Sequence, residues 1–255
     1  MAVVYGPPRN LPRSISGLQI WLDASDNTTL FDNTTGGSIV TSDGAAIARW
    51  EDKSDNQRHI TQSTAGSRPI LKKSIQNRND IIRFDGVDDI LFRLDAFVYS
   101  AGASTIFCVI KATPTANTTL MTERSSITSN PNYIVLACGF SDSTKLRSYI
   151  RNDANTNVLD IQTPTLSAFD GTFQLIGKVD TGSNIALYIN KTTNTNSNYT
   201  RSATTLDRFA VGGSRAATSS AFFACDLAEI IIYNRVLSSL DRQKIENYLY
   251  RKWKI

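Results

Sequence analysis

Apolar and polar residues alternate along much of this chain with the period of two that is typical of β-strands. In residues 17–25, GLQIWLDAS, the apolar Leu18, Ile20 and Leu22 share one side of the chain. The same alternation returns in residues 184–189. Each stretch therefore predicts a strand with one buried face.

One stretch is apolar on both sides. In STIFCVIKA, Ile106, Cys108 and Ile110 alternate with Phe107 and Val109. A strand that is buried on both faces belongs in the middle of a sheet. Further strand-like stretches are IARWEDKS, DIIRFDGVDDILF, NYIVLACGF, KLRSYIRND, TFQLIGKVD, SNIALYINKT, RFAVGG and CDLAEIIIYN.

Polar stretches separate these strands. Residues 26–44 are rich in Asn, Thr and Gly and predict a long loop with short hairpin pieces. Asp180-Thr181-Gly182 predicts a hairpin between its two flanking strands. Residues 190–205 are also polar, and we expect them to join residues 26–44 on a loop-rich outward face.

Only the end of the chain has a helical pattern. Ile245, Tyr248, Leu249 and Trp253 form one apolar stripe at helical spacing, and Ser238 suits an N-cap. The pattern predicts a helix over residues 239–253 that packs on the outside of the strands.

Together these elements predict an all-β fold, a two-sheet antiparallel sandwich with one C-terminal helix. No linker divides the chain, so we expect one domain over residues 15–255. Residues 1–14 contain Pro7, Pro8 and Pro12, and they predict an extended N-terminal arm.

Charge and composition argue against several classes of function. The formal net charge is +4, from 27 basic and 23 acidic residues, which predicts no nucleic-acid partner. No apolar run approaches the roughly 20 residues of a membrane-spanning helix, and the first residues do not resemble a signal peptide. Cys108, Cys138 and Cys225 lie in apolar stretches and predict reduced core residues, made in a reducing cytoplasm.

Both ends of the chain resemble the LamG-like, concanavalin A-like jelly-roll superfamily. The segments that carry the resemblance are GLQIWLDASD, WEDKSDNQRHITQ, RPILKKSIQNRNDIIRFDGVDDIL and FFACDLAEIIIYNRVLSSLDRQKIENYLYRKW. The resemblance implies a jelly-roll topology. It leaves function open, because the superfamily includes lectins, glycosidases, adhesion modules and virion proteins.

The residues predict no enzyme. Glycosidases of this superfamily carry the alternation Glu-x-Asp-x-x-Glu on one strand, and the chain lacks it. Asp226 and Glu229 are three residues apart, so we expect them on opposite faces of a strand. His59 is the single histidine, and no nucleophile motif accompanies it.

Two kinds of binding residue remain. Asp85, Asp88 and Asp89 offer closely spaced oxygens for calcium, as do Asp23, Asp26 and Asn27. The alternative for both sets, ordinary polar turn residues, is favoured because no EF-hand pattern accompanies either. No other cofactor is expected. Aromatic rings that could stack on a sugar are predicted at Trp21, Tyr133, Tyr149, Tyr188 and Tyr199.

The resemblance and the arm favour a structural protein of a bacteriophage particle, such as a capsid decoration, fibre or baseplate component. It would be a homo-oligomer, most readily a trimer, that attaches to other virion proteins and binds a host glycan. It would be made in the host cytoplasm and located in the virion. The alternative is a carbohydrate-binding or adhesion module of a bacterial surface protein.

Overall fold

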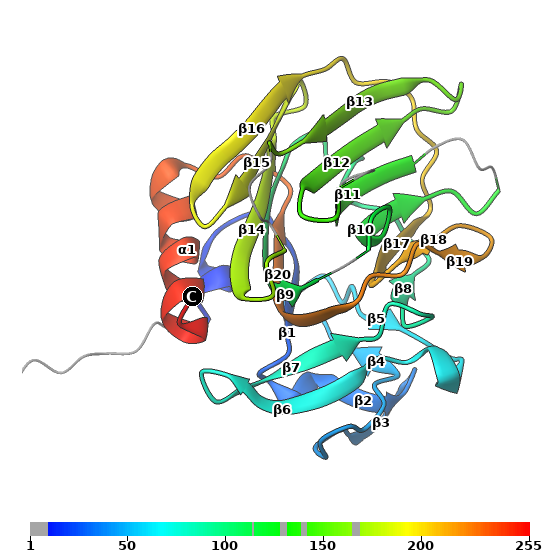
Figure 1. Ribbon diagram of the computed structural model, residues 1–255, viewed down its shortest axis with the longest axis vertical. Coiled ribbons are helices and arrows are strands. Elements are labelled where there is room, and N and C mark those ends of the chain that lie inside the picture. Colours follow the sequence, from blue (N-terminus) through cyan, green and yellow to red (C-terminus); the bar gives the residue numbers. More distant parts are fainter. Residues whose placement is uncertain (1–9, 114, 128–131, 139–141, 165–168) are drawn as a thin grey trace, which may run out of the picture.

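The structure is a computed structural model of the 255-residue chain, and it describes residues 10–113, 115–127, 132–138, 142–164 and 169–255. Two large antiparallel sheets face each other, and one α-helix lies outside them at the C-terminus (Figure 1). This confirms the predicted all-β sandwich with its terminal helix. The finer jelly-roll assignment stays a prediction.

The first sheet, called sheet A here, has eight strands. Its order is β16 (Thr192–Asn198), β15 (Asn184–Ile189), β14 (Phe173–Asp180), β9 (Ser104–Ala112), β20 (Cys225–Tyr233), β7 (Asn79–Phe84) and β6 (Ile70–Gln76). Strand β1 (Leu18–Asp23) pairs with the second half of β20. The predicted central strand β9 lies between β14 and β20, which confirms its two buried faces.

The second sheet, sheet B, has ten strands. Its order is β13 (Asn157–Gln162), β12 (Leu146–Arg151), β11 (Asn132–Cys138), β10 (Thr119–Arg124), β17 (Arg208–Val211), β8 (Leu91–Arg93), β5 (Ile60–Thr61), β4 (Arg49–Trp50), β2 (Leu30–Asn33) and β3 (Gly36–Ile39). A small ribbon, β18 (Ser214–Arg215) with β19 (Ser219–Ser220), stands beside it. Three short 3-10 helices complete the described elements: η1 (Leu11–Ser14), η2 (Asn27–Thr29) and η3 (Ala65–Ser67).

The main core fills the space between the sheets. Ile106, Cys108 and Ile110 of β9 point into it, and Leu187 of β15 meets them from the same sheet. The predicted inward positions of β15 are therefore confirmed, as are Ile20 and Leu22 of β1. Leu18 packs on the helix side instead, because the register shifts between Leu18 and Ile20. All three cysteines are buried free thiols, as predicted.

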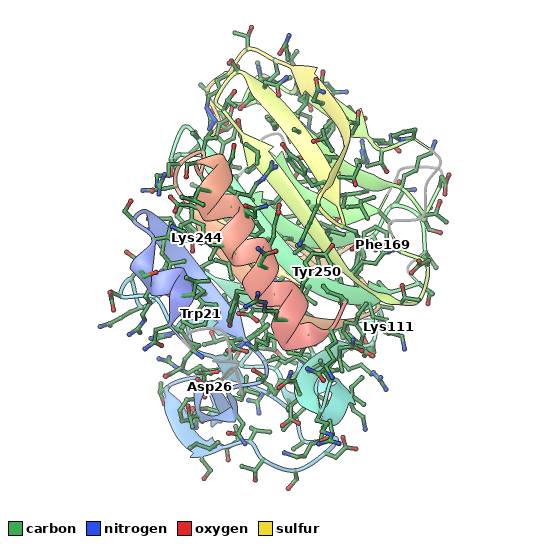
Figure 2. All side chains as sticks on the ribbon, turned by 90° about the vertical axis from the view of Figure 1, so that its left-hand side faces the viewer. Trp21, Asp26, Lys111, Phe169, Lys244 and Tyr250 are labelled. Carbon is green, nitrogen blue, oxygen red and sulfur yellow. The ribbon has the colours of Figure 1, made fainter. Side chains whose placement is uncertain are left out.

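A second core lies under the helix α1 (Ser239–Trp253), whose bounds match the prediction. Ser238 caps the helix by accepting a hydrogen bond from the Asp241 backbone N–H (3.1 Å). The predicted apolar stripe, which ends at Trp253, packs against Phe107 of β9 and its neighbours. Figure 2 shows the helix lying across the outer face of sheet A, so the part of this face beneath the helix is closed to solvent.

A polar connection joins the two sheets inside the main core. Lys178 of β14 is fully buried, and its ammonium donates to Tyr133 of β11 and to Ser148 of β12 (2.9 Å). Burial lowers the pKa of Lys178 to about 7, against the attraction of Asp180 and Glu123. Glu123 is buried as well and accepts three backbone hydrogen bonds from residues 97–99.

The prediction of an extended arm through residue 14 is wrong for its last part. Residues 11–14 form the 3-10 helix η1, because Pro12 suits the first turn of such a helix. Pro12 is buried, and its carbonyl accepts a hydrogen bond from the Tyr233 hydroxyl (3.0 Å). Pro7 and Pro8 lie outside the described residues.

Seven strands are absent from the prediction: β5, β6, β10, β13, β16, β18 and β19. The stretch 190–205, expected as a loop, contains β16, an edge strand of Thr, Asn and Ser that pairs with β15. Edge strands of this kind lack an apolar face, so alternation does not reveal them. In the part of the chain described here, no helix has the length and apolar character needed to cross a membrane.

Candidate functional site

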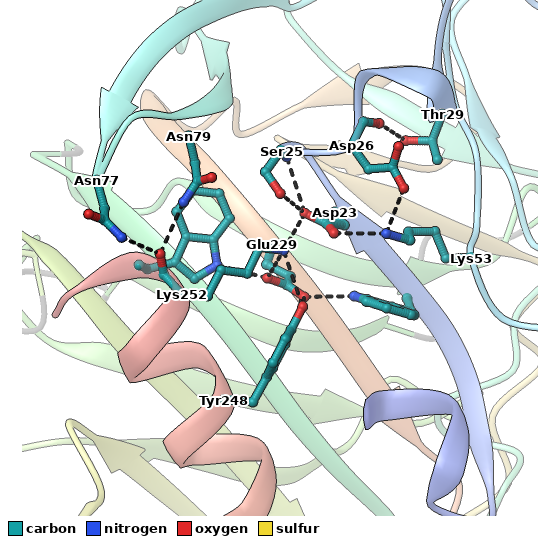
Figure 3. Close-up of polar contacts among 12 residues, drawn as sticks. Asp23, Ser25, Asp26, Thr29, Lys53, Asn77, Asn79, Glu229, Tyr248 and Lys252 are labelled. Carbon is teal, nitrogen blue, oxygen red and sulfur yellow. Dashed lines mark hydrogen bonds and ion pairs between the residues drawn. The ribbon is translucent and has the colours of Figure 1, made fainter. Parts of the chain in front are cut away.

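The helix-covered face contains a buried cluster of charged and aromatic side chains (Figure 3). Its centre is Glu229 of β20, which is fully buried and accepts four hydrogen bonds. The donors are Trp21 Nε1 (2.7 Å), the Tyr248 hydroxyl (2.8 Å), Trp253 Nε1 (2.7 Å) and Lys252 Nζ (2.8 Å). The carboxylate therefore joins β1, β20 and α1.

Two lysines balance the charge of this cluster. Lys252 also donates to Asp23 (2.6 Å), and Lys53 bridges Asp23 (2.9 Å) and Asp26 (2.7 Å). Burial opposes the charge on Asp23, but Lys252 and Lys53 hold its pKa below the ordinary value. Burial raises the pKa of Glu229 despite the nearby Lys252.

A polar pocket of about 620 Å³ opens over this cluster. Asn77 and Asn79, from the β6–β7 hairpin, donate to the Lys252 carbonyl at the end of the helix (2.8 and 3.0 Å). Tyr248 is 4% exposed, so its ring offers no stacking surface to a ligand. The polar groups of the floor bind one another, which indicates that this cluster attaches the helix to the sheet.

Sheet B leaves its outer face without a covering helix (Figures 1 and 2). Its outward side chains form rows across neighbouring strands. One row runs through the paired residues Arg208, Arg124, Asn132, Arg151 and Asn157. The next row contains Thr122, Ile134, Tyr149 and Asp160.

A shallow groove of about 490 Å³ crosses these rows on β11, β12 and β13. Arg147 makes a two-pronged ion pair with Asp160 (2.8 Å for both contacts), and its guanidinium lies 4.9 Å from the centre of the Tyr149 ring. The Tyr149 hydroxyl donates to Asn157. These contacts hold the side chains of the groove in place.

One atom of the groove is left unsatisfied. Asn132 is 7% exposed, and its buried Oδ1 has no hydrogen-bond partner among the described residues. A buried acceptor without a donor costs free energy, about 1–3 kcal/mol. The atom is closed to solvent, so the hydroxyl group of a ligand would supply the missing donor once a neighbouring side chain moves aside.

The groove and its margin are rich in arginine. Arg147 and Arg151 line the groove, and Arg124 stands in the same row as Arg151, on the other side of Asn132. Burial lowers the pKa of Arg124, and the charge of Arg151 lowers it further. The like charges of the two side chains repel each other across Asn132.

The other predicted aromatic residues do not join Tyr149. Trp21 does face away from the main core, but the helix covers it completely, so its expected place in a sugar platform is wrong. Tyr133 and Tyr199 are also buried, and the Tyr199 hydroxyl donates to Asp180 (2.8 Å). Tyr188 lies under the guanidinium of Arg242, 4.7 Å from its ring centre, on the helix side of sheet A.

The acidic sets expected to bind calcium differ in their surroundings. The lysine ammonium groups already neutralise Asp23 and Asp26, which argues against calcium there. Asp85, Asp88 and Asp89 have carboxylate oxygens within 4.8 Å of one another, in the turn between β7 and β8. Burial raises the pKa of Asp89 to about 6, with contributions from the two neighbouring carboxylates. Calcium at this turn stays a prediction.

The expectation that Asp226 and Glu229 face opposite sides of β20 is wrong. The register of β20 shifts between Leu227 and Glu229, so both carboxylates lie on the outer face of sheet A. They have separate partners, because Asp226 binds Arg83 (2.6 and 2.9 Å). His59 accepts a hydrogen bond from the Asp52 backbone N–H (3.0 Å), which uses its Nδ1.

The sequence analysis missed most of the groove. Asn132, Arg147, Arg151, Asp160 and Gln162 occupy outward positions of strands whose inward residues are apolar. The alternation in KLRSYIRND already separates Arg147, Tyr149 and Arg151 from the core positions. Alternation does not predict the order of the strands in the sheet, and it is this order that brings these residues together.

Comparisons with known proteins extend the description of the fold. No protein-family model matches the sequence, and no curated protein matches it. Trypanosoma rangeli sialidase in complex with sialic acid is similar in structure, with a TM-score of 0.57 and 13% identity over 93% of this chain and 33% of that chain. The complex of the same enzyme with 2,3-difluoro-KDN gives a TM-score of 0.56 and 13% identity, over 99% of this chain and 36% of that chain.

A carbohydrate-binding module, the CBM40 of Ruminococcus gnavus IT-sialidase bound to α2,3-sialyllactose, is more distant. Its TM-score is 0.46 and its identity 16%, over 55% of this chain and 79% of that chain. At such identities the likeness to the sialidase shows a shared β-sandwich fold and nothing about the site. This chain spans about a third of the length of the sialidase chains it matches.

Proposed function

We propose that this protein is a non-catalytic carbohydrate-binding module that binds its ligand in the groove of sheet B beside Tyr149. The observation that carries the proposal is the buried and unsatisfied Asn132 Oδ1 on an open sheet face. Sugars are dense in hydroxyl donors, and they are bound by amide, carboxylate and guanidinium groups held in fixed positions. The groove offers these groups in Asn157, Gln162, Asp160 and Arg147.

The contrast with the other sheet supports this choice of site. On sheet A the polar groups under the helix satisfy one another, and the aromatic rings are buried. On sheet B the groove is open, and Tyr149 forms part of its lining. Its ring is 9% exposed and partly covered by Arg147, so it supports the ligand from the side rather than as a broad stacking platform.

The absence of catalysis is part of the proposal. A retaining or inverting glycosidase needs two carboxyl groups about 5–10 Å apart across the scissile bond. Asp160 is the single carboxylate among the residues that line the groove, and Arg147 already binds both of its oxygens. Release of reducing ends from a broad polysaccharide panel should therefore stay at background.

The sialidase structures give this proposal limited support. They are complexes of the enzyme with sialic acid and related compounds, and their chains contain a region with the same fold as this protein. Since this chain matches about a third of that enzyme, glycan binding by the shared region is a proposal for this protein. Display on a virus particle, assembly into a trimer and location in the virion stay predictions from the sequence. Several copies displayed together would add avidity to a weak glycan contact.

A pair of tyrosine variants tests the proposed site. Tyr149→Ala should weaken binding to glycans that the unaltered protein retains, by about tenfold, an effect that corresponds to roughly 1.4 kcal/mol. The matched control is Tyr250→Ala on α1, whose ring contacts Lys191 far from the groove. Glycan-array binding followed by titration calorimetry measures both. Equal binding by the two variants would place the site elsewhere, and the absence of binding to any glycan would refute the function.

A further inference from the structure

We propose that the groove selects saccharides that carry carboxylate or sulfate groups; this inference rests on the proposed function and names its ligand class. The reason is the charge of the side chains around Asn132. Arg147 and Arg151 line the groove against a single carboxylate, Asp160. Arg124 and Arg208 continue the row of Arg151 toward the middle of the sheet.

The strand register makes this a continuous basic row. Neighbouring strands are about 4.8 Å apart, so β10 and β12 place Arg124 and Arg151 about 10 Å apart at the backbone. Long side chains on either side of Asn132 can approach each other over that distance. The lowered pKa of Arg124, to which Arg151 contributes after burial, agrees with this arrangement.

The nearby acidic groups are engaged. Both oxygens of Asp160 bind Arg147, and Asp207 accepts from the Ser126 backbone N–H (2.8 Å) and from its hydroxyl. Asp153, which follows Arg151 on the chain, accepts from the Thr205 backbone N–H (2.8 Å) and hydroxyl (2.9 Å). These hydrogen bonds leave the carboxylates charged, and Asp207 lies 3.8 Å from the guanidinium of Arg208. Four guanidinium groups, those of Arg124, Arg147, Arg151 and Arg208, still outnumber the three carboxylates, so an added anion at the row would meet a positive local field.

A saccharide fits this site better than a simple anion or a nucleic acid. A guanidinium binds a carboxylate or sulfate through two parallel hydrogen bonds. The neighbouring Asn132 Oδ1 needs a donor, and a sugar hydroxyl supplies one on the same molecule. Single-stranded nucleic acids are held by several exposed aromatic rings, whereas the one ring in this groove is 9% exposed.

The experiment uses ligand pairs that differ in charge alone. The full chain is titrated with trigalacturonate and its methyl ester, and with 3′-sialyllactose and lactose, at low and high salt. We expect the acidic member of at least one pair to bind about tenfold more tightly, with an advantage that shrinks as salt rises. Equal binding of both members of every pair would overturn the inference while leaving glycan binding intact.

Two isosteric variants assign the effect to the groove. Gln162 lines the groove, and Gln162→Glu adds one negative charge there without a change of shape. It should weaken binding of the acidic ligand at least fivefold more than binding of the neutral ligand. Gln243→Glu adds the same charge on the exposed side of α1 and should have no effect.

Three other outcomes would each contradict the selection of acidic saccharides by the groove in a different way. If both variants weaken acidic binding equally, the selectivity is a property of net charge and the groove is not its source. If a single-stranded DNA 12-mer competes with the acidic saccharide at equal concentration, the ligand class is wrong. If no saccharide of either kind binds, the proposed function itself fails, and this result is distinct from equal binding of each pair.

Discussion

The outer faces of the two sheets both carry charged and aromatic side chains, but they use them differently. On sheet A, Glu229 accepts four hydrogen bonds under the helix, and two lysines neutralise its surroundings. On sheet B, the buried Oδ1 of Asn132 has no partner among the described residues. The cluster on the first face is complete by itself, whereas we propose that a ligand completes the second.

This difference follows from what covers each face. A helix that removes water from a polar cluster must leave no donor or acceptor unmet, because each unmet group costs about 1–3 kcal/mol. An open face meets water or a ligand instead, so it can keep unsatisfied groups. The polar pocket beside Lys252 is larger than the groove, yet its groups are engaged within the protein.

The largest expected effect comes from opening the covered face. Trp253 is fully buried and donates to Glu229, so Trp253→Ala should lower the free energy of unfolding by about 3–5 kcal/mol. Leu240→Ala, at a position of the same helix that is 63% exposed, should change it by less than about 0.5 kcal/mol. Urea unfolding measures both. Equal midpoints would show that the helix does not seal this face.

A second test concerns Lys178, which ties sheet A to sheet B. Its folded pKa of about 7 lies below the ordinary lysine value, so the unfolded chain binds more protons between the two values. Stability should therefore rise with pH, by about 2 kcal/mol between pH 7 and pH 9. Lys178→Met should remove this rise. A rise of the same size in the variant would assign the pH dependence to other groups.

A smaller effect is expected at the turn that carries the chain from sheet A to sheet B. If Asp85, Asp88 and Asp89 hold calcium with millimolar affinity, then several millimolar calcium should stabilise the protein by about 1 kcal/mol. Thermal unfolding with calcium and with a chelator measures this. Asp88→Asn should remove the shift. Identical melting curves under both conditions would show that the three carboxylates bind no calcium and serve only as turn residues.

The smallest change in stability is expected on the open face. Gln162→Glu should alter the free energy of unfolding by less than about 0.5 kcal/mol, because the side chain packs against no buried cluster. The same substitution should alter acidic-ligand binding, as described above. A large loss of stability would mean that this face has a structural role like that of the covered face.

Much of the fold follows from local patterns. The alternation identified β1, β9, β15 and β20, because a strand with a buried face must repeat every two residues. It gave the inward residues correctly in β9 and β15, whereas register shifts in β1 and β20 altered the facing of Leu18 and Glu229. The helix was equally clear, since its cap and its apolar stripe agree. The strand β16 was missed because Thr and Asn fill both of its sides.

The same sequence patterns predicted the candidate site residues less well. Tyr149 was identified as a candidate, but so was Trp21, and both occupy outward positions of their strands. The sequence could not distinguish them, because the helix that covers Trp21 is more than 200 residues away along the chain. A local bulge also placed Asp226 and Glu229 on one face, contrary to the simple alternation.

The sequence by itself determined most of the strands that have an apolar face, and where the helix begins and ends. These properties depend on neighbours within a few residues. The tertiary structure alone decided which sheet the helix covers and which strands stand side by side in sheet B. Those choices bring together Arg124, Asn132 and Arg151 from three separate strands. The groove exists because of that order, since each residue by itself is an ordinary polar position on a strand.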